Sequence, residues 1–479
     1  MTSAAAGSLE ALEPHRAHLR DVLGDELAGE TWLVGGVVRD ALLGRPLLDV
    51  DLATGGDPER AARAIASATS GTAFPLGDRL DGERGLWRVA ATADDGAEMQ
   101  YDVCALRGGS IETDVHARDF AANALALPLV GGELFDAHGG ASDIEAGRLR
   151  MVSTDVLDDD PLRLLRAARI AHLLDWTVDA DTVAAIRDRA ARAVEPAGER
   201  TFHELSLLLL HPEARRGWRL LEQLGLDAVL LPELDACRGM RQSRFHHLDV
   251  HDHTLAVLDN CEDLLAATDF WLPLPAEPGL AAAPWTDEQR LVVLLAALAH
   301  DLGKPATRTE RHDGRVGFVG HDDVGRDIVD QLAERWKWST AMRRAVGQLV
   351  GTHLDLGFLL HTDRGLRDRW RLRRKIGSDV LAEAVVLSVG DRFATSGLDD
   401  RRKWVRAHLE LAREVWTDHW REVRDGIPAP LLDGREIAAV AGIDPGPKVG
   451  ELVHLLAEAQ AVGEVTTRDE AEALVRAGA

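Results

Sequence analysis

Hydrophobic positions follow one pattern in the first third of the chain and another in the remainder. The first third has short apolar runs bounded by glycine, proline and acidic residues, which predict strands at residues 32–34, 47–52, 71–76, 86–92 and 99–106. Two segments between them have helical spacing, and the second starts with a capping residue, Asp57, and a first-turn proline, Pro58. Beyond these strands the apolar spacing is mainly helical. The pattern therefore predicts an α+β head followed by helical regions.

Length and composition bound the number of domains and the class of protein. The chain has 479 residues, more than one hydrophobic core usually serves. We place domain boundaries at residues 1–145 (head), 146–240 (neck), 241–425 (a histidine-rich domain) and 426–479 (tail). The 55 basic and 80 acidic residues give a formal charge of −25, which argues against a protein that coats nucleic acid non-specifically. Three scattered cysteines, no basic-then-apolar leader and no long apolar run predict a cytoplasmic protein without a membrane span.

Residues 32–51 combine three features of a nucleotide triphosphate site. Gly35 and Gly36 follow the first strand, where residues without Cβ allow backbone N–H groups to approach phosphate. Arg39 lies in the helix that follows. Asp49 and Asp51 are two apart in the next strand, so both carboxylates share one face and could hold Mg²⁺. Each feature alone is common in loops and solvated strands, and the prediction depends on their order.

This stretch resembles a known family. Gly35-Gly36-Val37-Val38-Arg39-Asp40 followed by Asp49-Val50-Asp51 is similar to the signature of the tRNA nucleotidyltransferase (CCA-adding enzyme) and bacterial poly(A) polymerase family. The resemblance implies a polymerase-β-like nucleotidyltransferase head and an all-helical neck, further domain and tail. It also implies template-independent transfer of CMP and AMP from CTP and ATP to a tRNA 3′ end. In that reaction Asp49 and Asp51 would be catalytic and would bind two Mg²⁺ ions.

The resemblance assigns further residues in the head. Asp102 is a carboxylate in the middle of an apolar strand, and the family has a catalytic carboxylate near the metal on that strand; a solvent-facing role is the alternative. The segment Ala117-Arg118-Asp119-Phe120 and then Asn123 resembles a family motif in which Arg118 would contact phosphate and Asp119 would read the ribose hydroxyls. The chain departs from that motif at Ala117, where a second arginine is usual, and at Ala121, where a threonine is usual. We also expect residues 108–112 to form a mobile loop.

The neck carries the candidate base reader. Asp160 and Arg163 are three apart at a helix start, so they point the same way. In the family an aspartate and an arginine at this spacing imitate a base-pairing partner, because cytosine and adenine both present an amine beside a bare ring nitrogen. Arg166 and Arg169 would stack or contact phosphate. A capped helix with an exposed ion pair is the alternative interpretation.

The histidine-rich domain resembles the HD phosphohydrolase superfamily. The candidate metal ligands occur in the superfamily's order: His253, His300, Asp301, His321, His353 and Asp391. Imidazole and carboxylate ligands suit Ni²⁺, Mn²⁺, Co²⁺, Zn²⁺ or Fe²⁺, and such a site can hydrolyse phosphate esters. A helical scaffold that has lost its metal is the alternative.

Two more segments could contact RNA. Residues 364–375 form the densest basic run of this acidic chain, and either a solvated helix face or a phosphate-binding patch would explain it. Gly446 and Lys448, at the start of a helix in the tail, could contact tRNA.

The motifs leave the exact activity open. An A-adding enzyme, a CC-adding enzyme and a poly(A) polymerase share all of them. Two further alternatives belong to other classes of protein. One is a protein whose main activity is phosphohydrolysis by the HD domain, and the other is a non-catalytic RNA-binding module. The motifs do not indicate an oligomeric state.

Overall fold

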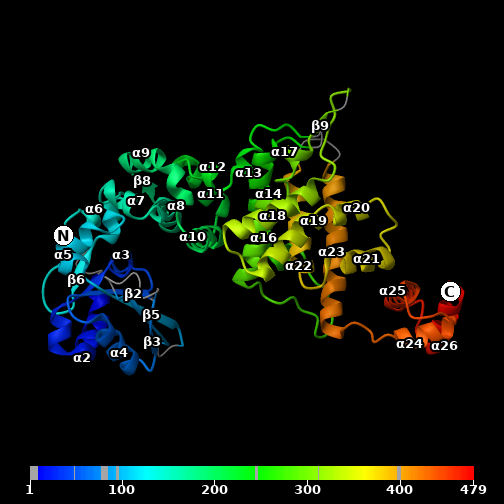
Figure 1. Cartoon of the computed structure of the whole chain (residues 1–479), viewed down its shortest axis with the longest axis horizontal. Coiled ribbons are helices and arrows are strands. Elements are labelled where there is room, and N and C mark those ends of the chain that lie inside the picture. The colour runs from blue at the N-terminus through cyan, green and yellow to red at the C-terminus, as the bar shows by residue number, and fades with distance from the viewer. Residues whose placement is uncertain are drawn as a thin grey trace. The chain divides into compact units, whose positions relative to one another are not determined.

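A computed structural model of the chain describes residues 9–47, 49–76, 85–92, 96–242, 246–310, 312–395 and 401–479. The chain divides into two compact units. The first comprises Met1–Glu204 with Leu220–Leu230, and the second comprises Leu205–Arg219 with Leu231–Ala479 (Figure 1). The four domain boundaries stay a prediction. Within the described residues, no helix has both the length and the apolar character needed to cross a bilayer.

The first unit is built around a six-stranded sheet with the order β3-β4-β5-β2-β1-β6. Strands β2 and β5 are parallel, and every other neighbouring pair is antiparallel. Helix α4 contacts β3, β4 and β5, and helix α2 contacts α4. The elements of the head are η1 (Glu10–Leu12), α2 (Glu13–Gly29), β1 (Thr31–Val34), α3 (Gly36–Leu42), β2 (Asp49–Thr54), α4 (Pro58–Ala68), β3 (Thr72–Pro75), β4 (Trp87–Thr92), β5 (Glu98–Ala105), η2 (Arg107–Gly109), α5 (Ile111–His116), η3 (Ala121–Asn123), β6 (Ala126–Pro128) and α6 (Gly140–Glu145).

The predicted strands of the head are present, with ends shifted by one or two residues. Asp57 caps α4 as expected, because its side chain accepts hydrogen bonds from the backbone N–H groups of Glu59 and Arg60. The expected loop at residues 108–112 is wrong: Ser110 caps helix α5 through the Thr113 N–H, and a short 3-10 turn precedes it. A turn that the sequence predicts at residues 94–96 falls partly outside the described residues. The α+β head and the helical remainder are confirmed.

Helices follow the head along the chain. The next elements in the sequence are α7 (Asp155–Asp159), α8 (Leu162–Leu174), α9 (Ala180–Asp188), η4 (Ala190–Val194), α10 (Gly198–Leu210), α11 (Ala214–Leu224), α12 (Asp227–Leu230) and α13 (Pro232–Asp235), with a two-stranded pair, β7 (Arg148–Leu149) and β8 (Thr177–Val178). Asp160 lies between α7 and α8, and its carboxylate accepts from the Leu162 N–H at 3.2 Å. The helix that carries the predicted base reader therefore begins where the sequence places it.

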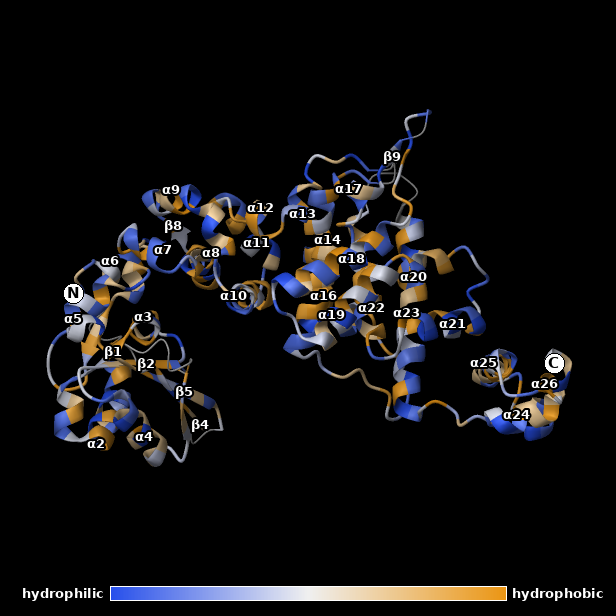
Figure 2. Cartoon of the chain, viewed as in Figure 1, coloured by the Kyte–Doolittle hydropathy of each residue, from blue (hydrophilic) through white to orange (hydrophobic). Residues whose placement is uncertain are grey.

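The second unit has a helical core. Helix α14 packs against α16 and α22, and α22 also packs against α23; hydrophobic residues gather along these helices (Figure 2). Residues 291–299 of α16 are all buried. The elements are α14 (Val250–Ala266), α15 (Thr268–Trp271), α16 (Asp287–Ala299), α17 (Lys304–Thr307), β9 (Thr309–Glu310), β10 (Val316–Gly317), α18 (His321–Arg335), α19 (Thr340–Thr352), α20 (Asp355–Leu359), α21 (Leu366–Ile376), α22 (Leu381–Ala394), α23 (Arg401–Asp425), α24 (Gly434–Ala441), α25 (Pro447–Ala461) and α26 (Arg468–Gly478).

Residues 366–375 of the basic run lie in helix α21, and the six cations of this part are paired with carboxylates. Their partners lie on α20, α23, α25 and the segment after α25: Arg367 pairs with Glu458 and Glu464, Arg369 with Glu414 and Asp418, Arg371 with Glu458, Arg373 with Asp418 and Glu422, Arg374 with Glu422, and Lys375 with Asp355. The run therefore joins helices of the second unit. This arrangement favours a structural role over a phosphate-binding patch.

A buried histidine on α23 makes the second unit sensitive to acid. His408 is 1% exposed, its Nε2 lies 3.1 Å from the Ser388 hydroxyl, and burial lowers its pKa to about 3. Because the unfolded chain binds a proton at this site near the ordinary histidine pKa, stability is complete above about pH 6.5 and is lost as the pH falls towards the folded value.

We expect this histidine alone to cost about 2 kcal/mol of unfolding free energy at about pH 5. His408→Gln can keep a hydrogen bond to Ser388 without titrating, so the variant should lose less stability between about pH 7 and pH 5 than the wild type does. Urea unfolding at both pH values measures this. His361→Gln, at an exposed position, is the matched control. Equal acid sensitivity in His408→Gln and the wild type would contradict the prediction.

Candidate active site and metal centre

The diglycine turn of the head lies directly against a carboxylate. Gly35 has a φ of +74°, and a Cβ there would lie 2.8 Å from Arg118 Nη1 and 3.2 Å from Asp51 Oδ2. A Cβ at Gly36 would lie 3.8 Å from the same carboxylate oxygen. Only glycine combines this backbone conformation with such close neighbours. The turn, Arg118 and Asp51 therefore form one compact corner at the end of β1.

Three acidic side chains share one face of the sheet beside this corner. Asp49 and Asp51 are two apart on β2, and the parallel register places Asp51 opposite Asp102 of β5. The pKa of Asp51 is raised to about 6, chiefly by burial; Arg118 opposes this rise and the nearby Asp102 adds to it. Clustered carboxylates that repel one another in this way match the preference of Mg²⁺ for oxygen ligands.

The third carboxylate already has a cationic partner. Arg88 of β4 is opposite Asp102 in the antiparallel register, and its Nε and Nη2 donate to the two carboxylate oxygens at 2.8 Å each. This bidentate pair is the geometry in which guanidinium binds carboxylate most strongly. Asp102 therefore lies beside the predicted metal ligands, but Arg88 neutralises it.

We expect Arg88→Met to tighten divalent metal binding at the head. Removing the guanidinium frees Asp102 and leaves a more negative site, so Mn²⁺ affinity should rise about 3- to 10-fold. Isothermal titration with Mn²⁺, in chains that also carry Asp301→Asn to suppress the other metal centre, measures the change. Arg60→Met, an exposed arginine on α4, is the control. Unchanged or weaker binding in Arg88→Met would contradict the prediction.

Three buried head residues form a chain of hydrogen bonds, and Arg166 of α8 adds an ion pair to it. Arg39 Nη1 donates to Asn123 Oδ1 at 2.7 Å, and Asn123 Nδ2 donates to Asp119 Oδ1 at 3.0 Å. Arg166 Nε lies 2.9 Å from Asp119 Oδ2. Burial opposes the ionisation of Asp119, but Arg166, Asn123 and the Phe120 N–H outweigh it and hold its pKa below the ordinary value.

These contacts restrict what the residues can do. Arg39 is 8% exposed and is also held by Asp40, so its chief visible role is to position the helix that follows the diglycine turn. Arg118 is fixed by Asp114, whose Oδ2 accepts from its Nε at 2.8 Å, and it remains beside Asp51. The predicted contacts of Arg39 and Arg118 with phosphate, and of Asp119 with ribose, stay predictions.

The predicted base reader lies at the start of α8. Arg163 donates to the carbonyls of Val156 and Ala117 at 2.9 Å each, which fixes the direction of its guanidinium. Asp160 Oδ2 lies 2.9 Å from Arg200 Nη2. Arg169 pairs with Glu204 on α10. The side chains of Asp160 and Arg163 are therefore each oriented by other groups.

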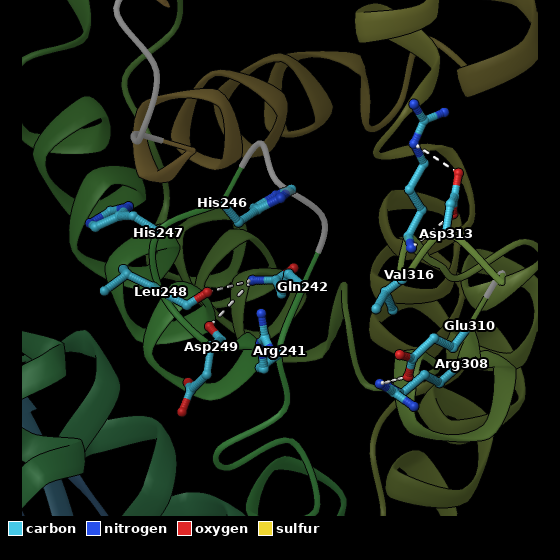
Figure 3. A pocket seen from close by; sticks show the side chains of 12 residues that line it. Arg241, Gln242, His246, His247, Leu248, Asp249, Arg308, Glu310, Asp313 and Val316 are labelled. Atoms are coloured by element: carbon cyan, nitrogen blue, oxygen red, sulfur yellow. Dashed lines mark hydrogen bonds and ion pairs between the residues drawn. The ribbon is translucent and has the colours of Figure 1, made fainter.

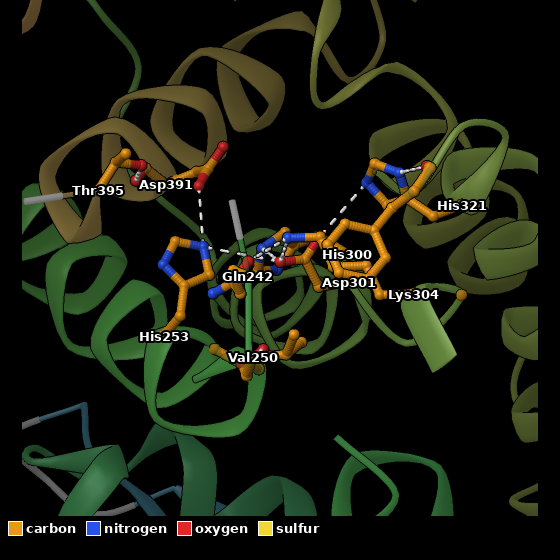
Figure 4. A network of polar contacts seen from close by, with 12 residues as sticks. Gln242, Val250, His253, His300, Asp301, Lys304, His321, Asp391 and Thr395 are labelled. Atoms are coloured by element: carbon orange, nitrogen blue, oxygen red, sulfur yellow. Dashed lines mark hydrogen bonds and ion pairs between the residues drawn. The ribbon is translucent and has the colours of Figure 1, made fainter. Parts of the chain in front are cut away.

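The six metal-ligand candidates of the second unit come from five helices or their ends, α14, α16, α18, α19 and α22. Figure 4 shows how His253, His300, Asp301, His321 and Asp391 converge. Their ligand atoms form two groups, each within 4.8 Å: His253, His300 and Asp391, and Asp301, His321 and His353. Asp301 joins the groups, because its Oδ2 lies 3.1 Å from His300 Nε2 and its Oδ1 lies 3.3 Å from His321 Nε2. A carboxylate between two sets of imidazoles is an arrangement that can bridge two metal ions.

Backbone carbonyls orient three of these imidazoles. Nδ1 of His300, His321 and His353 lies 2.8, 2.7 and 2.7 Å from the carbonyl oxygen three residues earlier. Each Nδ1 therefore carries the proton, and each Nε2 is left with a lone pair directed at the centre. Nε2 of His321 lies only 3.2 Å from Nε2 of His353. Two lone pairs at that distance repel unless a cation lies between them, so the residues present fit a metal.

Other atoms of the centre support this fit. His253 Nε2 lies 3.0 Å from Asp391 Oδ1. Among the described residues, however, no hydrogen bond of good geometry reaches Nε2 of His253 or of His300. Burial lowers the pKa of His353 to about 4, which keeps it neutral and able to bind metal. The interaction of Asp301 with His300 and Lys304 outweighs its burial and holds its pKa well below the ordinary value.

Two residues of the sites were not assigned a role from sequence. Arg88 is an isolated cation in an otherwise apolar strand, and that anomaly could have directed attention to it. Lys304 follows the His300-Asp301 pair by three residues, and its Nζ lies 2.5 Å from Asp301 Oδ2. Residues three apart at the end of a helix face the same way, so the pairing of Lys304 with Asp301 could also have been predicted from the sequence.

Known families match both the head and the histidine-rich domain. The family model described as the poly A polymerase head domain matches residues 31–150, the HD domain matches residues 250–396, and the probable RNA and SrmB-binding site of polymerase A matches residues 175–238. The chain is 38% identical to an A-adding tRNA nucleotidyltransferase of Deinococcus radiodurans over 93% of this chain and 94% of that protein. It is 36% identical to a CC-adding tRNA nucleotidyltransferase of Thermus thermophilus over 92% of each chain.

Solved structures share the fold. A CCA-adding enzyme in complex with CTP matches with a TM-score of 0.65 and 17% identity over 98% of each chain. A Thermotoga maritima CCA-adding enzyme complexed with tRNA matches with a TM-score of 0.59 and 18% identity over 99% of this chain and 98% of that one.

The fold and the two sites thus define a nucleotidyltransferase head combined with an HD domain. The chain belongs to the tRNA nucleotidyltransferase family. The resemblance drawn from the residue 35–51 motif is confirmed, and so is the prediction that the protein is an enzyme of this kind. Both the head and the HD domain belong to metal-dependent families, and the HD domain contains a group of residues that can hold metal.

Proposed function

We propose that the protein adds CMP and AMP, from CTP and ATP, to the 3′ end of tRNA in a reaction that requires Mg²⁺. The observation that carries this proposal is the corner at which the diglycine turn and Arg118 meet Asp51, with Asp49 and Asp102 on the same face. A triphosphate with its metal requires backbone N–H groups that can approach phosphate, a cation, and a row of carboxylates. The CTP, ATP and tRNA complexes of structural neighbours support these substrates.

Each part of the corner has a separate task. Asp49 and Asp51 would hold Mg²⁺, which activates the tRNA 3′ hydroxyl and neutralises phosphate charge when bound. The N–H groups of the turn and Arg118 would hold the triphosphate in line with that hydroxyl. Arg88 keeps Asp102 neutralised, so that charge repulsion within the row is limited.

Base selection would come from Asp160 and Arg163. Arg163 is held in place by two carbonyls and can donate to the bare ring nitrogen of cytosine or adenine, while Asp160 can accept from the exocyclic amine. Within the neck, Asp160 Oδ2 accepts a hydrogen bond from Arg200 Nη2. An incoming base would therefore exchange with Arg200 for this carboxylate.

We expect Asp160→Ala to weaken discrimination against UTP and GTP by about 10- to 100-fold, the cost of one buried hydrogen-bond partner in a recognition site. Ratios of kcat/KM for CTP over UTP and for ATP over GTP measure it. The neighbouring Asp159→Ala, at an exposed position, is the control and should leave the ratios unchanged. A uniform loss of rate for all four nucleotides in Asp160→Ala would contradict a base-reading role.

Feeding the nucleotides separately distinguishes the possible products. The purified chain is incubated with tRNA lacking CCA, tRNA ending in C, and tRNA ending in CC, each with CTP, with ATP or with both. Full CCA addition predicts extension of all three. Extension of the CC-ending tRNA alone, with ATP, would instead show an A-adding enzyme, as the Deinococcus relative is named. Products that stop at CC would show a CC-adding enzyme, as the Thermus relative is named.

We further propose that the HD domain hydrolyses phosphate esters with a bound divalent transition metal such as Ni²⁺, Mn²⁺, Co²⁺, Zn²⁺ or Fe²⁺. The facing Nε2 atoms of His321 and His353, with Asp301 between the two ligand groups, favour this second activity. When bound, the metal supplies an activated water and polarises the phosphoryl oxygen. Hydrolysis of bis(p-nitrophenyl) phosphate that depends on added Mn²⁺ and persists when Asp49 is replaced tests the proposal.

A further inference from the structure

The backbone carbonyl of Ala117 is a point at which two parts of the first unit meet. Arg107 Nη1, from the turn after β5, and Arg163 Nη2, from α8, both donate to it at 2.9 Å. Ala117 follows the last residue of helix α5, where carbonyls have no partner within the helix. A carbonyl oxygen has two lone pairs, so it can accept from both guanidinium groups at once. One backbone atom therefore connects the candidate base reader to the sheet of the head.

Arg107 is tied to the strands that carry the candidate metal ligands. It lies two residues beyond the end of β5, and the N–H of the intervening Leu106 donates to the Thr54 carbonyl at 2.9 Å. Thr54 is the last residue of β2, three residues after Asp51. A path of hydrogen bonds thus leads from the strand of Asp51, through Arg107, to Arg163 on α8.

The cation of the phosphate corner depends on the same turn. Asp114 is 1% exposed, and its two oxygens have different partners. Its Oδ1 accepts from the Arg107 N–H at 3.4 Å, and its Oδ2 accepts from Arg118 Nε at 2.8 Å. Arg118 directly follows Ala117 in the chain and lies against the diglycine turn. Arg107 therefore contacts the one segment on which both the phosphate corner and the base reader depend.

A contact in the second unit shows how unusual this arrangement is. Figure 3 shows Gln242 Nε2 donating to the carbonyls of Leu248 and Asp249, at 3.4 and 3.3 Å, beside a cleft of about 570 Å³. There one donor joins two neighbouring carbonyls of a single segment, which fixes that segment locally. At Ala117 two donors from different elements meet on one carbonyl, so the contact fixes those elements relative to one another.

We infer that Arg107 is a positioning residue that sets the spacing between the two ends of the nucleotide site. A nucleotide held by its base at Arg163 and by its triphosphate at Arg118 reaches the in-line geometry only if these two groups are correctly spaced, and an error of about 1 Å can cost about a hundredfold in rate. Arg107 acts through the Ala117 carbonyl and not through contact with the nucleotide. The inference rests on the base-reading role proposed above for α8.

We expect Arg107→Met to lower both the rate and the selectivity of nucleotide addition. For the correct nucleotide kcat should fall about 10- to 30-fold while KM changes less than about threefold, because alignment is lost and the triphosphate is still bound. A wrong nucleotide gains little from that alignment, so the kcat/KM ratios of CTP over UTP and of ATP over GTP should fall about tenfold. These ratios do not depend on the fraction of the chain that is folded. Arg60→Met, an exposed arginine on α4, is the control and should keep the wild-type ratios.

Two further variants separate positioning from a loss of stability. Arg107→Lys keeps one donor that can reach the Ala117 carbonyl, so its ratios should stay within about threefold of the wild type. Arg107→Met in a chain that already carries Arg163→Met should lower the ratios by no more than about twofold, because residues that act through one contact are not additive. Arg107→Gln, which is too short to replace the guanidinium, takes the place of Arg107→Met if that variant yields no folded protein.

The outcome with Arg163→Met alone distinguishes this inference from the proposed function. If Arg163→Met leaves the ratios unchanged, base reading by α8 fails and the role of Arg107 fails with it. If Arg163→Met lowers the ratios but Arg107→Met slows all four nucleotides equally, only the positioning role is overturned. Full additivity of the two substitutions would also overturn it, since each arginine would then act independently.

Discussion

Replacing Asp49 with alanine should abolish nucleotide addition, with a fall in kcat of at least about a thousandfold. Asp49 and Asp51 are the two carboxylates of β2 that share a face next to the diglycine turn. Losing Asp49 removes one ligand of the metal, and the in-line geometry that the metal supports is lost with it. Single-turnover incorporation of labelled CMP or AMP into tRNA measures the effect.

Two controls make this result specific. Glu98→Gln removes a carboxylate from the exposed start of β5 in the same sheet and should leave addition near the wild-type rate. Asp49→Ala should also leave Mn²⁺-dependent hydrolysis in the HD domain intact. Addition that survives in Asp49→Ala would mean that the carboxylate row is not the catalytic site.

Replacing Asp301 with asparagine should have the largest effect in the second unit. Its two oxygens face His300 and His321 in the two ligand groups, so the change removes a ligand from both. We expect Mn²⁺ affinity at the centre to fall at least about a hundredfold and phosphate-ester hydrolysis to be lost, while nucleotide addition continues. Metal content after dialysis and isothermal titration with Mn²⁺, both in chains that carry Asp49→Ala, measure the binding.

The pair of Asp301 with Lys304 requires a second control. Lys304 is buried, and asparagine leaves its ammonium without a charged partner, which destabilises the fold. The double variant Asp301→Asn/Lys304→Met removes both charges and should restore stability without restoring metal binding. Asp323→Asn, an exposed carboxylate on α18, should change neither property. Full Mn²⁺ binding by the folded double variant would contradict the assignment.

The sequence was most informative where function depends on local spacing. Asp49 and Asp51 share a face because strand side chains alternate, and Gly35 adopts a positive φ in contact with Asp51 as a turn residue can. Likewise, Asp57 caps α4, and the Asp160 carboxylate accepts from the Leu162 N–H at the start of α8. These relations need only a few consecutive residues.

Features that depend on distant pairing were not predictable in the same way. The bidentate pair of Arg88 with Asp102 needs the register of β4 against β5, which no local pattern fixes. The basic helix α21 is neutralised by carboxylates such as Asp418 and Glu458, which are about 45 to 90 residues further along the chain. The convergence of the HD ligands was expected only because of the family resemblance.

The central claim is that the head transfers nucleotides to tRNA in a defined and limited number. The most direct test is to incubate the purified chain with all four nucleotides, Mg²⁺ and either tRNA lacking its 3′ CCA or an unrelated RNA of equal length, and to sequence the 3′ ends. The account predicts that tRNA gains only C and A, that growth stops when the CCA end is complete, and that the unrelated RNA is not extended. Long runs of A on both RNAs would contradict it and would show a poly(A) polymerase instead.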